Sequence, residues 1–156
     1  LEFRRVLFRS VVGEIGQLNG RPQVWWPVHC VQNSHGADFH PLLTDDLISH
    51  IIYKGQNRLI DSYSAFFDND HEYQTGLHTL LQSMQIEHLT ILGIATDYCV
   101  KFTVLDALQL GYQVSVVMDG CRGVNIQPDD SQLAFNQMQQ HGAVLVDSVT
   151  MLKSDK

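Results

Sequence analysis

Short apolar runs alternate with helix-like stripes of apolar residues along most of the chain. The runs are rich in β-branched residues and predict strands at residues 50–53, 89–94, 112–118 and 143–146. The stripes place apolar residues at i, i+3, i+4 and i+7 and predict helices at residues 77–84, 100–108 and 128–141. Because helices separate most of the strands, the pattern predicts an α/β fold built from βαβ units around a parallel sheet.

Glycine, proline and capping residues indicate where these elements begin and end. Residues 13–22 contain three glycines and one proline among polar side chains, which predicts a loop. Either Thr96 or Asp97 can cap the start of the second helix through its side-chain oxygen. Gly111 then suits the position just after the end of that helix, where a left-handed conformation is common.

Composition narrows the class of protein. A length of 156 residues predicts one domain, and no apolar stretch approaches the roughly 20 residues of a membrane-spanning helix. The formal charge of −7 argues against a nucleic-acid partner. The three cysteines are widely spaced and form no CxxC pair, so we expect a reducing, cytoplasmic setting. Because no apolar stretch is long enough to span a membrane, we expect no membrane partner.

The first ten residues differ from the rest of the chain. They carry three of its ten basic residues and begin with Leu-Glu-Phe, a sequence typical of a translated cloning or adapter segment. We therefore expect residues 1–10 to be a foreign leader and residues 11–156 to form a single domain. The alternative is a short edge strand at residues 6–8.

Cys99 has the most reactive setting predicted from the sequence. It follows the predicted strand at 89–94 by five residues and lies in the first turn of the next helix. Unpaired N–H groups and the helix dipole at such a position favour a thiolate and can hold an oxyanion. The alternative is a buried cysteine that acts as a small hydrophobic residue. Cys30 and Cys121 lack this setting, and we expect them to be structural.

Lys54 and His29 are weaker candidates for a site. Lys54 ends an apolar run, so it can emerge at the same sheet edge as Cys99 and stabilise a thiolate or oxyanion, or simply be solvated. The eight histidines fit no zinc-binding spacing. Trp26 lies close to His29, and its ring can pack in the core or stack on a flat ligand. The sequence has no P-loop, GxGxxG or GxSxG motif, so nucleotide binding and serine hydrolysis have no support.

Several motifs together resemble a known family. In chain order they are WPVHC at 26–30, KG at 54–55, DSYSAF at 61–66, GIATDYCV at 93–100 and DGCRGV at 119–124. They are similar to motifs of bacterial nicotinamidases (pyrazinamidases) in the isochorismatase-like cysteine hydrolase superfamily, and the similarity extends from about residue 13 to residue 149. The resemblance implies a three-layer αβα, Rossmann-like fold with a mostly parallel sheet, here without its first two strands.

The resemblance implies a role for each reactive residue. Cys99 would be the nucleophile that attacks a carboxamide carbon, and Lys54 the catalytic lysine beside it. Ala95 would follow a cis peptide bond, and its N–H together with that of Cys99 would form the oxyanion hole. The attack would release ammonia and leave a thioester on Cys99, which water would then hydrolyse.

The resemblance also implies a small-molecule substrate. Trp26, Tyr63 and Ala95 match substrate-binding positions, and the implied reaction converts nicotinamide to nicotinate and ammonia in NAD salvage. His29 matches a ligand to a divalent metal (zinc, or manganese or iron) that holds the pyridine nitrogen.

Some parts of the family's site have no counterpart in the sequence. No aspartate precedes His29, where the resemblance places a general base and further metal ligands, and the only acids there are Glu2 and Glu14. We therefore expect an N-terminally truncated, inactive fragment with an incomplete metal site. We also expect open sheet edges that make the chain fold poorly or aggregate.

Two alternative functions stay open at this stage. One is a sibling hydrolase that acts on another amide or on isochorismate. The other is a non-catalytic binding protein that keeps the pocket but lacks the base and the metal. The sequence does not distinguish oligomeric states.

Overall fold

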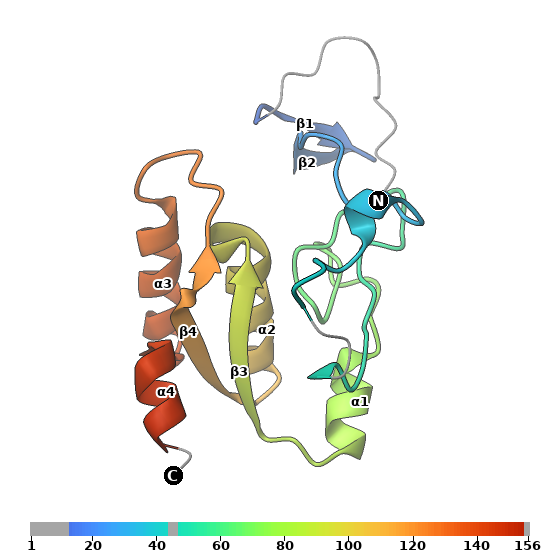
Figure 1. The fold of residues 1–156 in the computed structure, drawn as a ribbon. Helices are drawn as coiled ribbons and strands as arrows, with labels where there is room; N and C mark the ends of the chain where they lie inside the picture. The colour runs from blue at the N-terminus through green and yellow to red at the C-terminus, as the bar shows by residue number, and fades with distance from the viewer. Residues whose placement is uncertain (1–12, 44–46, 155–156) are drawn as a thin grey trace.

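The structure is a computed structural model that describes residues 13–43 and 47–154 (Figure 1). The expected leader at residues 1–10, with its alternative strand at 6–8, lies outside the described residues. In chain order the elements are β1 (Ile15–Leu18), β2 (Arg21–Val24), η1 (His35–Ala37), α1 (Leu77–Ser83), β3 (His88–Ile94), η3 (Thr96–Val100), α2 (Lys101–Gln109), β4 (Gln113–Arg122), α3 (Asp130–Gln140), β5 (Val144–Val146) and α4 (Ser148–Ser154).

A three-stranded parallel sheet confirms the predicted α/β class. The strand order is β3-β4-β5, with Leu89 opposite Val114 and Val116 opposite Leu145. The helix α2 connects the first pair of strands and α3 the second, and the two helices contact each other. The predicted strands at 89–94, 112–118 and 143–146 and the three predicted helices are therefore present. The carboxyl end of β3 leads directly into the turn that holds Cys99.

The hydrophobic core lies where this sheet meets its helices. Val104 and Ala107 of α2, Val116 of β4 and Met138 of α3 have no exposed surface. Phe66 is 1% exposed and joins the same cluster from the long segment between β2 and α1. That segment is therefore anchored to the core, although it has little regular structure.

Residues 13–22 were expected to form a loop, and this prediction is wrong. Strands β1 and β2 form an antiparallel hairpin with Leu18 paired to Arg21. The turn consists of Asn19 and Gly20, with φ values of 50° and 79°. Asn-Gly is the sequence most suited to a two-residue turn with two positive φ angles, and its backbone twist matches that of the strands. A close contact also requires a glycine in β1, because a Cβ at Gly16 would lie 2.1 Å from Trp25 Nε1.

The strand predicted at residues 50–53 is absent from the structure. Residues 51–57 have no regular secondary structure, and Ile51 and Tyr53 are 48% and 71% exposed. A strand is stabilised by hydrogen bonds to a neighbour, and within residues 13–43 and 47–154 no strand pairs with this segment. Lys54 therefore comes from an extended coil and not from the end of a strand.

The start of the helical segment after β3 also differs from the sequence prediction. The chain after β3 first makes one π-helical turn, η3, whose N-cap residue is Ala95 and not Thr96 or Asp97. Gly111 does follow the end of α2 with a φ of 92°, as expected. The short helix α4 was not predicted. No helix in the described part of the chain is long and apolar enough to cross a membrane.

Candidate active site

Cys99 lies in η3, at the junction between β3 and α2. Its side chain is partly exposed and its thiol is free. The peptide bond between Ile94 and Ala95, just before this turn, is cis, as the family resemblance implies. The hydroxyl of Thr103 donates a hydrogen bond to the Cys99 carbonyl oxygen at 2.6 Å and accepts one from the Ala65 N–H at 2.9 Å. The turn that carries Cys99 is therefore joined to the loop that carries Tyr63.

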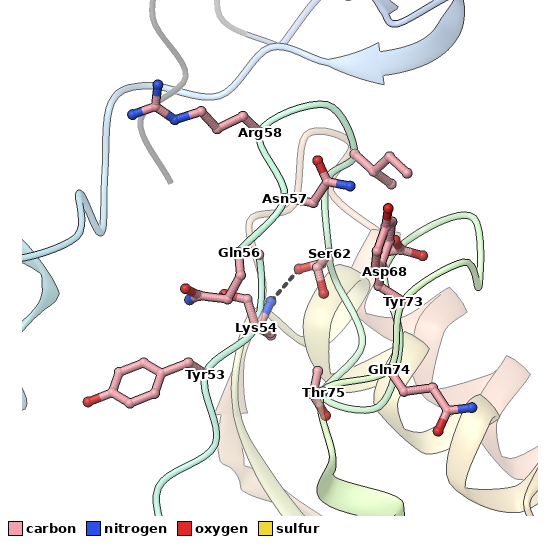
Figure 2. Close-up of a pocket in the computed structure, with 12 residues that line it drawn as sticks. Tyr53, Lys54, Gln56, Asn57, Arg58, Ser62, Asp68, Tyr73, Gln74 and Thr75 are labelled. Atoms are coloured by element: carbon pink, nitrogen blue, oxygen red, sulfur yellow. Dashed lines mark hydrogen bonds between the residues drawn. The ribbon is translucent and has the colours of Figure 1, made fainter.

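The structure brings Lys54 and Cys99 together across 45 positions of the sequence. Lys54 Nζ lies 3.4 Å from Cys99 Sγ and also donates a hydrogen bond to the Ser62 carbonyl oxygen at 2.6 Å. Figure 2 shows the Lys54 side chain directed toward Ser62, with this second hydrogen bond dashed. An ammonium group beside a thiol favours the thiolate form. The geometry therefore suits nucleophilic chemistry at Sγ.

Trp26 and Tyr63 form an aromatic group beside the turn that carries Cys99. Trp26 Nε1 donates a hydrogen bond to the Tyr63 hydroxyl at 3.3 Å. The rings of Trp26 and Tyr63 each make an edge-to-face contact with the ring of Tyr98, and the distances between ring centroids are 4.7 Å for Trp26 and 5.3 Å for Tyr63. Burial raises the pKa of Tyr63 to about 12. Because Tyr98 precedes Cys99 directly, the two predicted substrate-binding rings lie next to the segment that carries the thiol.

Asp97 has a different role from the helix cap predicted for it. Its carboxylate is 4% exposed and accepts hydrogen bonds from the N–H groups of Val124 and Asn125 at 3.0 Å and 2.8 Å. These contacts tie the Cys99 turn to the loop between β4 and α3. The motif containing Asp97 was recognised from the sequence, but the partners of the side chain lie 27 and 28 residues away and depend on the fold.

His29 is exposed, and its Nδ1 lies 2.6 Å from the Pro27 carbonyl oxygen. If Nδ1 carries the proton, Nε2 faces outward as the ring nitrogen that could bind a metal. A catalytic zinc ion usually needs three protein ligands. The described residues contain no group of three His, Cys, Asp or Glu side chains that could hold a metal ion. These residues therefore do not form the metal site that the resemblance implies.

The other two cysteines differ in exposure. Cys121 is 4% exposed, and burial raises the pKa of its thiol. Cys30 is exposed and has a positive φ of 47°. Burial supports the structural role predicted for Cys121, whereas the exposure of Cys30 gives that prediction no support.

Two cavities flank the site without enclosing Cys99. The first, of about 530 Å³, is lined by Lys54, Ser62 and neighbouring polar residues (Figure 2). The second, of about 420 Å³, lies between the hairpin and the helices α2 and α3 and is lined by Tyr63 and Tyr98. Lys54 therefore borders the first cavity, and the rings of Tyr63 and Tyr98 border the second.

Comparisons with known proteins agree with this geometry. A family model described as the isochorismatase domain matches residues 11–149. The nicotinamidase of Escherichia coli K12 is 60% identical over 130 residues, which cover 83% of this chain and 61% of the relative. The chain spans about three fifths of the length of the curated relatives it matches.

Solved structures show the same fold. A nicotinamidase/pyrazinamidase from Acinetobacter baumanii has a TM-score of 0.86 at 39% identity, covering 91% of this chain and 68% of that protein. The pyrazinamidase of Pyrococcus horikoshii, solved in complex with zinc, has a TM-score of 0.66 at 36% identity. The match covers 78% of this chain and 63% of the pyrazinamidase chain. The family model covers most of the chain and the fold agrees, so the chain belongs to the isochorismatase family.

Proposed function

We propose that this chain carries the nucleophile and lysine of an amidohydrolase that converts nicotinamide to nicotinate and ammonia. The observation that carries this proposal is the 3.4 Å distance between Lys54 Nζ and Cys99 Sγ. The 60% identity to the Escherichia coli nicotinamidase supports the choice of substrate. The alternatives of a sibling hydrolase and of a non-catalytic binding protein have no comparable support.

In the proposed reaction, the Cys99 thiolate attacks the carboxamide carbon while the Lys54 ammonium stabilises the negative charge. The N–H groups of Ala95 and Cys99 hold the oxygen of the tetrahedral adduct. The adduct collapses when the C–N bond breaks and the leaving nitrogen takes up a proton from water, which releases ammonia and leaves a thioester and a hydroxide ion. Water then attacks the thioester, forms nicotinate and returns the thiol.

The aromatic pair Trp26 and Tyr63 would bind the pyridine ring. Their hydrogen bond holds the two side chains in fixed positions, and the rings provide flat apolar surfaces for a flat ligand. His29 as a metal ligand stays a prediction, because the described residues supply no complete site, and no step of the reaction is assigned to a metal. The expectation that the chain does not turn over by itself also stays a prediction.

The test compares substrates. We would assay ammonia release from nicotinamide, pyrazinamide and benzamide, and hydrolysis of isochorismate, by the chain alone and by its fusion to the N-terminal two-strand segment of a close relative. We expect the fusion to hydrolyse nicotinamide and pyrazinamide much faster than benzamide, which lacks the ring nitrogen. Preference for isochorismate would instead favour a sibling hydrolase. Ammonia release by the chain alone would contradict its predicted inactivity.

A further inference from the structure

Lys54 reaches Cys99 from a segment that has no strand or helix to hold it. Residues 51–57 are irregular, and the Lys54 side chain is exposed. An exposed lysine on such a segment normally samples many rotamers. Besides Cys99, its Nζ contacts the Ser62 carbonyl oxygen at 2.6 Å. The position of Lys54 therefore depends on how firmly the Ser62 peptide is fixed.

Asp61 binds the backbone of Ser62 from the buried side, at the N–H group one peptide unit before the carbonyl group that contacts Lys54. The Asp61 residue is 7% exposed, and its Oδ1 accepts a hydrogen bond from the Ser62 N–H at 2.7 Å. Its Oδ2 accepts a hydrogen bond of 2.7 Å from Nε2 of Gln23, a residue of β2 that is 6% exposed. The Asp61 carbonyl oxygen accepts a third hydrogen bond, from the Asn69 N–H at 2.8 Å. Asp61 is thus held by two separate parts of the chain.

We propose that Asp61 is a positioning residue for Lys54. By holding the Ser62 N–H it fixes the backbone of Ser62, so that the carbonyl oxygen of the same residue keeps the ammonium group beside Cys99, and Gln23 in turn holds Asp61. This inference rests on the proposed function, in which Lys54 assists Cys99. It also gives the β1–β2 hairpin a role, because Gln23 of β2 supports Lys54 through Asp61 and Ser62.

Alkylation of Cys99 tests this inference without requiring turnover. The full chain is treated with iodoacetamide, and the modified Cys99 peptide is followed by mass spectrometry, so that Cys30 does not interfere. We expect Lys54→Met to slow alkylation at neutral pH by about fivefold or more, because an ammonium group favours the reactive thiolate. Asp61→Ala should slow it to a similar extent. The double variant should be no slower than Lys54→Met alone, because Asp61 acts through Lys54.

A conservative variant and a matched control separate positioning from general destabilisation. Asp61→Asn keeps an oxygen for the Ser62 N–H but replaces the acceptor of the Gln23 amide, whose Nε2 also donates to the Val24 carbonyl oxygen at 2.9 Å, so alkylation should be slowed less than in Asp61→Ala. Asp106→Ala removes another buried carboxylate, 6% exposed, that makes no contact with Lys54 or Ser62, and it should leave the rate unchanged. Circular dichroism of each variant reports on folding. If Asp61→Ala does not fold, Gln23→Met replaces it and should also slow alkylation.

The possible results distinguish the two proposals. If Lys54→Met slows alkylation but Asp61→Ala and Gln23→Met do not, the positioning role is wrong and the Lys54–Cys99 pair stands. If Asp61→Ala slows alkylation further in the Lys54→Met background, Asp61 acts independently of Lys54 and the inference is again wrong. If Lys54→Met leaves alkylation unchanged, the activation of Cys99 in the proposed function is itself contradicted.

Discussion

The indole N–H of Trp26 donates a hydrogen bond to the Tyr63 hydroxyl across 37 positions of the sequence. Gln23 Nε2 approaches the same hydroxyl oxygen at 3.4 Å. Two N–H donors therefore face one phenol oxygen, which leaves the phenol proton available for an acceptor atom of a ligand.

Tyr63→Phe tests whether this hydroxyl matters for ligand binding. The variant keeps the ring but leaves the Trp26 N–H without its acceptor, which costs about 1 kcal/mol or more when the donor is partly buried. We expect nicotinamide or nicotinate to bind roughly fivefold more weakly, as measured by quenching of tryptophan fluorescence. Tyr73→Phe, at a tyrosine that is 58% exposed, is the control and should bind normally. Equal affinities for the two variants would exclude Tyr63 from the binding site.

The ionisation of Tyr63 gives a pH-dependent prediction. Burial raises its pKa to about 12, above the ordinary value of 10, so the folded protein holds the phenol proton more tightly than the unfolded chain. The stability that this adds is complete below pH 10 and is lost as the pH rises through 12. In an absorbance titration, Tyr63→Phe should remove part of the tyrosinate signal near pH 12. If the variant removes signal only near pH 10, this description of the Tyr63 environment is wrong.

The hairpin turn gives a prediction about backbone conformation. Gly20 has a φ of +79°, and a Cβ added there would meet no atom within 4 Å, so Gly20→Ala changes only the backbone strain. We expect a loss of about 1 kcal/mol in hairpin stability. Hydrogen exchange of the Trp25 amide, which donates to the Glu14 carbonyl oxygen at 2.9 Å, reports on the hairpin directly. Gly36→Ala is the control, because Gly36 has no positive φ, and it should leave this exchange rate unchanged.

An uncovered face of β3 gives a prediction about self-association. Leu92 and Ile94 alternate onto the same face of the strand and are 59% and 76% exposed. Within the described residues β3 pairs only with β4, so its other edge has no partner there. Such an edge beside exposed apolar side chains promotes association between chains. We expect the sedimentation coefficient to rise with protein concentration, and Leu92→Lys to suppress this rise. Leu133→Lys, at a leucine of α3 that is 61% exposed, is the matched control and should have a smaller effect. A monomer at all concentrations, with a sharp two-state melt, would contradict this prediction.

The sequence predicted best the parts of the fold in which local pattern and tertiary packing agree. Leu89 and Ile91 of β3 pack against the core and Val104 of α2 lies in it, so burial reinforces the local preference of both elements. The run at residues 50–53 has an equally strand-like pattern, but no strand in the described part of the chain lies beside it. Because β propensity alone does not form a strand without a hydrogen-bonded neighbour, this segment is irregular.

Other features could not be predicted for different reasons. The hairpin had a readable signal in Asn19-Gly20, which was outweighed by the number of glycines around it. The contact between Gln23 and Asp61 spans 38 positions and has no local pattern at all. Cys99, Lys54 and Trp26 were predicted from their local setting, and the resemblance to a family then gave them roles and added Tyr63. Supporting residues such as Asp61 appear only when the contacts are known.

Ammonia release from nicotinamide, with and without Cys99, tests the central claim most directly. The chain fused to the N-terminal segment of a close relative is compared with the same protein carrying Cys99→Ala or Cys30→Ser. The proposed function predicts that Cys99→Ala abolishes release, because no thioester can form, and that Cys30→Ser retains it. Release that persists in Cys99→Ala would contradict the assignment of Cys99 as the nucleophile.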